Sequence, residues 1–171
     1  MQDLTPWANF YVITGSSAAA LTGLMFVVIT LVAGQERMQH AQDGVETFSS
    51  PTVVHFCVAL LISAILSAPW HAHTGPAVML ALTGAYGVVY AARIMRRMGK
   101  TSVYEPGFDD WFWYALSPLV AYAALLAAAF LFARFPHQAL FAFAACTILF
   151  IFLGIRNAWD TVTYIAVNVS D

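Results

Sequence analysis

Residues 137–155 read HQALFAFAACTILFIFLGI, a run without a single Asp, Glu, Lys or Arg. A helix needs roughly 20 mostly apolar residues, each rising about 1.5 Å, to cross the hydrocarbon core of a bilayer. The run therefore predicts a transmembrane helix. Four earlier runs meet the same criterion, so the sequence predicts five spans in all, the other four at about 10–33, 51–70, 76–95 and 111–133.

The composition of the whole chain agrees with this prediction. Hydrophobic residues make up 61% of the 171 positions and charged residues only 9%, whereas a soluble domain carries roughly a quarter charged residues. We predict an all-α protein, a polytopic transmembrane helical bundle forming a single domain over residues 1–171, with a helical tail on the cytoplasmic side after the fifth span. The net charge of −2 offers no basic patch for nucleic acid, so the lipid bilayer is the expected partner.

Basic residues in short loops orient such a bundle, because they stay on the cytoplasmic side. Four of the seven Lys and Arg residues fall between the third and fourth spans, namely Arg93, Arg96, Arg97 and Lys100. This loop is predicted to be cytoplasmic, which gives an N-out, C-in orientation in what we expect to be a bacterial inner (cytoplasmic) membrane. An alternative has four spans, with the third or fifth run lying in the interface, and it would place both termini on one side.

Tryptophans give a second indication of orientation, because they collect at the level of the lipid headgroups. In the predicted threading, Trp7 and Trp70 fall at the outer interface. The other three, Trp111, Trp113 and Trp159, fall at the inner one. No tryptophan is left in the middle of a predicted span.

Small residues at every fourth position are typical of helices that approach one another closely in lipid. The first predicted span carries Gly15, Ala19 and Gly23 in this register, and the third carries Thr83 and Gly87. We predict that both sets contact a neighbouring helix, either in the same chain or in another.

The second predicted span has a polar stripe. His55, Ala59, Ser63 and Ser67 follow one another at four-residue steps, and side chains four apart are neighbours on a helix surface. One interpretation is a seam of small residues in which the Ser hydroxyls bond back to the preceding turn. The other is that His55, Ser63 and Ser67 line a pathway for ions or small solutes.

Ionisable residues at the end of the fifth span form a second candidate site. Arg156 and Asp160 are four residues apart, so they can pair along one helix face, and Asn157 lies beside Arg156. Charged groups in a span are costly and are a functional hypothesis by default. We predict either a buried ion pair that fixes helix packing or gates an inner vestibule, or interfacial groups in which Arg156 reaches toward water.

Histidines in the predicted outer turns form a third candidate set. His71 and His73 lie between the second and third spans, and His137 lies between the fourth and fifth. Imidazoles bind divalent transition metals and titrate near neutral pH. No Cys or acidic ligand with matching spacing stands nearby, so we predict no resident metal and keep these three residues as the candidates for metal or pH sensing.

The chain lacks the sequence patterns of catalysis. It has no Gly-rich phosphate loop and no zinc-protease helix, and only His55 lies clearly within a span, which is too few for a bis-His haem site. We therefore predict no enzyme activity and no cofactor. The two cysteines, Cys57 and Cys146, lie in separate apolar runs and are expected to behave as small apolar side chains.

Three functions are compatible with these features. The first is a homo-oligomeric channel or pathway for ions or small solutes, because the second span is polar along one stripe and five helices alone rarely enclose a path. The second is a non-catalytic accessory subunit that packs on other membrane subunits through Gly15, Ala19 and Gly23. The third is a pH- or metal-responsive membrane sensor that uses the turn histidines.

Overall fold

The structure is a computed structural model that describes residues 4–33, 42–98, 107, 109 and 111–169. The regular elements in these residues are all helical, and none of these residues belongs to a strand. The order is a short 3-10 turn η1 (Thr5–Trp7), α1 (Ala8–Ala33), α2 (Gln42–Ser67), α3 (Thr74–Met98), a π-helical turn η3 (Trp111–Leu116), α5 (Ser117–Leu131) and α6 (Pro136–Val169).

Four stretches of helix are long and apolar enough to cross a bilayer. They are Thr5–Thr30, Thr74–Arg96, Trp111–Leu131 and Pro136–Asp160. Their length and composition indicate a helical membrane protein. The apolar part of α2, Pro51–Ser67, is shorter than these. The helices at four of the five predicted spans thus meet the requirement, and the second span stays a prediction.

Helix α2 differs from the predicted second span at both ends. Pro51 is predicted to be its first residue, whereas α2 starts at Gln42 and holds Pro51 in its interior. Hydropathy indicates only the apolar part of a helix. Pro51 removes one backbone hydrogen bond, but α2 continues through it. At the other end α2 stops at Ser67. The carbonyl of Ile65 accepts there from the backbone N–H of Ala68 at 3.3 Å and from the Trp70 indole Nε1 at 2.6 Å.

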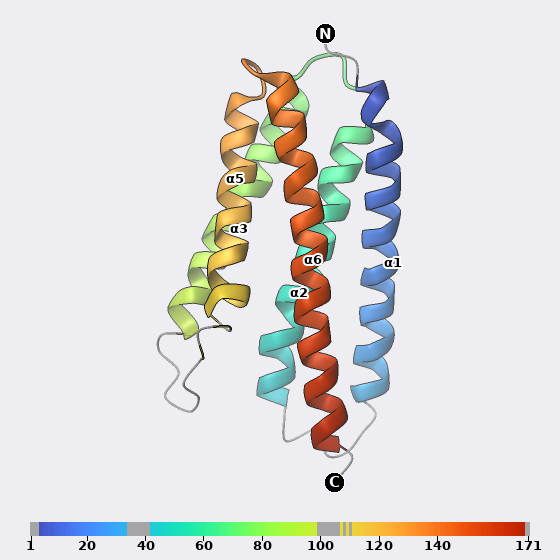
Figure 1. Ribbon diagram of the computed structural model, residues 1–171, viewed down its shortest axis with the longest axis vertical. Coiled ribbons are helices and arrows are strands. Elements are labelled where there is room, and N and C mark those ends of the chain that lie inside the picture. Colours follow the sequence, from blue (N-terminus) through green and yellow to red (C-terminus); the bar gives the residue numbers. More distant parts are fainter. Residues whose placement is uncertain (1–3, 34–41, 99–106, 108, 110, 170–171) are drawn as a thin grey trace.

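The helices run alternately in opposite directions, so the start of α1 and the end of α6 lie at opposite ends of the bundle (Figure 1). Helix α2 packs against α1 and α6, α3 packs against α5, and α5 packs against α6. Contact between α2 and α3 is slight. The bundle therefore consists of two helix pairs, α1 with α2 and α3 with α5, joined along α6.

The core follows the inner face of α6, where Phe143, Phe150 and Leu153 are fully buried. Close approach of α2 to this face depends on Gly154, because a Cβ atom there would stand 2.4 Å from the ring of Phe56. The residue before Phe56 is His55. The close approach at Gly154 thus brings His55, which lies clearly within a predicted span, against α6.

A π-helical turn opens the fourth predicted span, and the hydropathy pattern does not predict it. Pro118 lacks a backbone N–H, so the carbonyl of Tyr114 cannot accept the usual hydrogen bond from four residues further on. A wider turn over Trp111–Leu116 is the response, and such turns are frequent at functional sites. The side chain of Tyr114 is buried in this turn.

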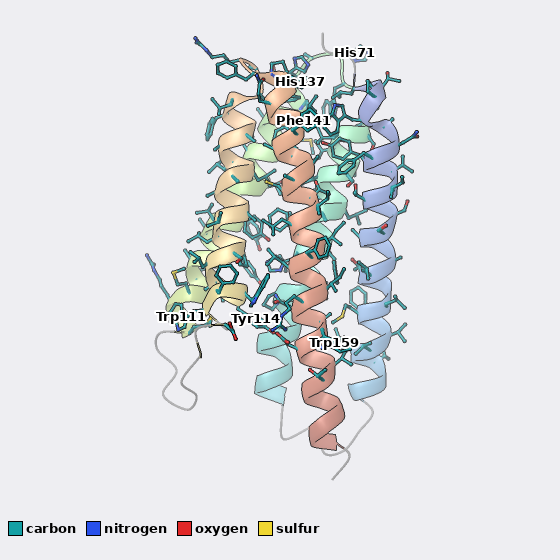
Figure 2. The ribbon with its side chains drawn as sticks, viewed as in Figure 1. His71, Trp111, Tyr114, His137, Phe141 and Trp159 are labelled. Carbon is teal, nitrogen blue, oxygen red and sulfur yellow. The ribbon has the colours of Figure 1, made fainter. Side chains whose placement is uncertain are left out.

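Two of the histidines and two of the tryptophans lie at opposite ends of the bundle. Figure 2 shows His71 and His137 at the end where α1 begins, and Trp111 and Trp159 at the other. The predicted threading also puts these histidines and these tryptophans at opposite interfaces. Which end faces the cytoplasm stays a prediction.

Candidate functional site

The polar stripe of α2 does not form a single face. His55 and Ser63 are buried, whereas Ser67 is exposed. Residues four apart advance by about 400° along a helix, so each step turns the stripe by about 40°. His55 contacts α5 and α6, and Ser63 contacts α1. The three residues therefore have different surroundings within the chain, and their lining of a pathway stays a prediction.

Ser63 belongs to the contact between α1 and α2. Its hydroxyl oxygen lies 3.1 Å from that of Thr14, and its own hydroxyl bonds back to the carbonyl of Ala59 at 2.9 Å. Gly15 allows this approach, because a Cβ atom there would stand 2.9 Å from the Cβ of Ser63. For Ser63, the seam of small residues is the interpretation that fits.

His55 lies inside the bundle without a hydrogen-bond partner in the described part of the chain. Its side chain is 1% exposed, and neither Nδ1 nor Nε2 is within hydrogen-bond distance of a described donor or acceptor. The imidazole ring stacks on Phe150 of α6, with 6.0 Å between ring centroids and an interplanar angle of 23°. A buried polar atom without a partner costs about 1–3 kcal/mol, so His55 needs an explanation that packing alone does not give.

Tyr122 of α5 presents a second such atom beside the first. Its ring centroid lies 6.1 Å from that of His55 and 4.6 Å from that of Phe150. The tyrosine is fully buried, and its hydroxyl oxygen has no hydrogen-bond partner among the described residues. Two neighbouring side chains thus carry three buried polar atoms that have no hydrogen-bond partner among the described residues.

Helix α3 closes this arrangement with its backbone. A Cβ atom on Gly87 would stand 1.9 Å from Cδ1 of Tyr122, so the tyrosine ring lies directly against α3 where Gly87 provides the space. We call His55, Gly87, Tyr122 and Phe150 the central cluster. Its members come from α2, α3, α5 and α6, which makes it the place where both helix pairs meet α6.

Tyr122 was not among the residues predicted from sequence. A signal was present, because after Ser117 it is the only residue of α5 with a strongly hydrogen-bonding side chain. Tyrosines are enriched at the two interfaces of a membrane rather than between them. A lone tyrosine in the middle of an Ala- and Leu-rich span is therefore a sign of an internal polar site.

The predicted pair at the end of the fifth span is formed. Nη1 of Arg156 donates to Oδ1 of Asp160, and the hydroxyl of Tyr114 donates to Oδ2 of the same carboxylate at 3.5 Å. The Arg156 guanidinium also lies over the ring of Trp113, 5.9 Å from its centroid. The side chains of Arg156 and Asp160 are 39% and 33% exposed, so the pair is partly exposed and not buried as one interpretation required.

Asn157 differs from its charged neighbours, because it is fully buried. It follows Phe150 by seven residues, which places both on the same side of α6. We call Arg156, Asp160 and Tyr114 the terminal polar group. Arg156 directly precedes Asn157, and Asp160 follows it by about one turn. Asn157 therefore lies between the central cluster and Asp160.

The turn histidines do not come together as a metal site. No group of three His, Cys, Asp or Glu side chains suited to hold a metal ion occurs among the described residues. The rings of His73 and His137 instead contact aromatic neighbours, at 5.0 Å from Phe132 and 5.1 Å from Phe141 between centroids. The three-imidazole metal site considered from the sequence thus has no counterpart in this part of the structure.

The predicted packing residues divide into two kinds. Gly15 and Gly87 are in close contact with other helices of the chain, as described above. Ala19 is exposed, and nothing lies within 4 Å of a Cβ atom built on Gly23, because the four-residue register turns away from α2 as it proceeds. Thr83 bonds back to the carbonyl of Met79 at 2.8 Å and lines an open groove.

Comparison with known proteins adds no family to these observations. No protein-family model, curated protein sequence or solved structure matches the chain.

Proposed function

We propose that this chain is a five-span protein of the bacterial inner membrane, N-out and C-in, that carries protons across the bilayer through the interior of each protomer. On this path, the proton passes through the central cluster. The function expected from the sequence, a pathway for ions or small solutes, is thereby narrowed to the proton.

The observation that carries this proposal is the pairing of His55 with Tyr122. Their buried ring nitrogens and hydroxyl have no partner among the described residues, and a polar side chain inside a membrane span is costly unless it has a task. Imidazole accepts a proton on one nitrogen and releases one from the other. A histidine and a tyrosine whose rings are neighbours can pass protons when water links their polar atoms by hydrogen bonds.

Further polar groups extend from the central cluster toward both ends of the bundle. Asn157 follows Phe150 by two turns of α6, about 10 Å along the axis, and Ser63 follows His55 by about 12 Å along α2. Asp160 of the terminal polar group lies beyond Asn157, and Thr14 lies beside Ser63. Each of these steps needs several ordered waters in series to link the side chains.

Tight packing around His55 favours a proton over a larger cargo. Phe150 and Tyr122 lie with 4.6 Å between ring centroids, and the backbone of α3 at Gly87 lies against the second of them. A hydrated ion or a solute needs a passage wide enough to hold it. A proton needs only groups that exchange hydrogen bonds, and a path inside the protomer does not depend on the homo-oligomer that the sequence led us to expect.

Proton flux into proteoliposomes tests the proposal. Purified protein is reconstituted with a pH-sensitive dye inside, and a K⁺ diffusion potential set by valinomycin drives the flux. We expect acidification above that of empty liposomes for the natural chain, and loss of it for His55→Phe and Tyr122→Phe. Tyr86→Phe is the matched control, because Tyr86 is exposed and lies outside the cluster.

Two results would overturn the proposal. One is flux through the natural chain no greater than through empty liposomes. The other is a full rate in both cluster variants, which would remove His55 and Tyr122 from any path. Each variant is first compared with the natural chain by its elution profile in detergent, so that a loss of flux is read only from folded protein.

A second candidate function is an accessory subunit of a membrane complex. The observation that favours it is the outward face of α1, where the small residues Ser16, Ala19, Ala20 and Gly23 are exposed. Small residues let helices approach closely in lipid. Co-purification of a larger complex from the native membrane, lost in Ala19→Leu but retained in Ala123→Leu on the exposed side of α5, would support this function. Recovery of the chain alone would count against it.

A further inference from the structure

A groove between α2 and α3 is a feature that the proposed function does not use. It has a volume of about 410 Å³. Its lining includes Val54, Cys57 and Leu61 from α2 and Leu82, Thr83 and Tyr86 from α3. The Thr83 hydroxyl is taken up by the carbonyl of Met79 at 2.8 Å, so the lining offers an almost wholly apolar surface.

The groove opens to the outside of the bundle, because contact between α2 and α3 is slight. Leu61, Leu82 and Tyr86 are 41%, 66% and 68% exposed. Thr74–Arg96 has the length and composition of a membrane span. In a bilayer, the groove therefore faces the acyl chains of lipids.

A cationic group stands at one end of the groove. Tyr86 stacks on Tyr90, with 6.4 Å between centroids and 13° between the ring planes. Arg93 follows Tyr86 by seven residues, which is two helical turns or about 10 Å on the same face of α3. Its side chain is exposed, and it forms no ion pair with the described residues.

We propose that this groove binds an anionic phospholipid, with an acyl chain between α2 and α3 and the phosphate at Arg93. Two independent features support a lipid over a helix from another protein. The apolar part lies where acyl chains lie, and the cation stands about 10 Å from Tyr86 on the same face, as the headgroup of such a lipid requires. Basic sites between transmembrane helices are a known mode of binding for anionic headgroups.

Photo-crosslinking tests this proposal on the full chain. The protein is placed in phosphatidylcholine nanodiscs with a small fraction of either phosphatidylglycerol or phosphatidylcholine that bears a diazirine on one acyl chain. After irradiation, labelled peptides are mapped by mass spectrometry. We expect phosphatidylglycerol to label the groove residues of α2 and α3 about fivefold more than phosphatidylcholine does, the factor that one basic residue contributes near an anionic lipid.

Three variants make the result specific. Arg93→Gln removes the cation and should bring the two lipids to equal labelling. Arg134→Gln is the matched control, because Arg134 is exposed and follows α5 at the other end of the bundle. Cys57→Trp fills the groove from an exposed position and should lower labelling by both lipids.

Equal labelling of the groove by the two lipids in the natural chain would overturn the proposal. So would labelling spread evenly over all outward-facing helices. Absence of label from the groove residues with both lipids would also contradict it. None of these outcomes depends on proton flux, so the test of the lipid site is independent of the test of the proposed function.

Discussion

The hydroxyl oxygens of Thr14 on α1 and Ser63 on α2 lie 3.1 Å apart, and Gly15 beside Thr14 gives the two helices room to meet. In lipid there is no hydrophobic force to hold helices together, so close packing and hydrogen bonds between helices have a larger share of the stability. Only 17% of the membrane-length stretch of α1 is buried. This contact joins α1 to the rest of the bundle.

Replacing Gly15 by Val should therefore loosen α1. The new side chain would meet the Cβ of Ser63 at 2.9 Å, and overpacking of this kind costs about 1–3 kcal/mol. Gly23→Val makes the same chemical change where nothing lies within 4 Å. Thermal unfolding in detergent should show a lower midpoint for the first variant than for the second. Equal midpoints would mean that the packing of α1 against α2 does not depend on Gly15.

Gly87→Ala should destabilise the protein more than Gly23→Ala does. Its Cβ would overlap the ring of Tyr122 at 1.9 Å, and the ring is enclosed by other helices. The loss should be about 1–3 kcal/mol. A smaller side chain at the other partner, in Gly87→Ala combined with Tyr122→Leu, should recover part of it, which a double-mutant cycle measures. Additive effects would show that the two residues do not touch.

Tyr122→Phe is expected to raise stability while it lowers proton flux. The change removes one buried hydroxyl that has no partner in the described structure, and relief of such a group is worth about 1 kcal/mol. Unfolding midpoints in detergent check the first effect and the liposome assay checks the second. A less stable variant with unchanged flux would instead assign the hydroxyl a structural role.

Zinc or nickel ions should leave the unfolding midpoint unchanged. Ligands that bind only the folded state raise its stability, but His71, His73 and His137 form no three-ligand group in the described structure. The check is a thermal shift titration of the natural chain against His71→Gln. A midpoint that rises with metal for the natural chain and not for the variant would restore the sensor hypothesis.

Hydropathy was sufficient to predict where four of the membrane-length helices lie, because each has a long run without charge. It was a poorer guide to α2, whose polar first turns before Pro51 carry no hydropathy signal although they continue the helix. Spacing rules predicted the pairing of Arg156 with Asp160, since that contact lies within one helix. Contacts within a helix need only its geometry.

Contacts between helices could not be predicted in the same way. The meeting of His55 with Tyr122 depends on which helices are neighbours and how they are rotated, and a single sequence contains neither. The four-residue stripes from Gly15 to Gly23 and from His55 to Ser67 were read as straight faces. They wind around their helices by about 40° a step, so only part of each stripe meets a given neighbour.

The π-helical turn at Trp111–Leu116 affects the directions in which the side chains of two buried tyrosines point. Tyr114 and Tyr122 are eight residues apart, and in a regular helix their side chains would diverge by about 80°. Part of the π-helical turn lies between the two tyrosines, and its wider winding reduces this divergence. Both tyrosines then contact α6, the first at Asp160 and the second at Phe150. A single local irregularity of the backbone thus aligns two phenols along one neighbour, which a regular helix of the same sequence would not do.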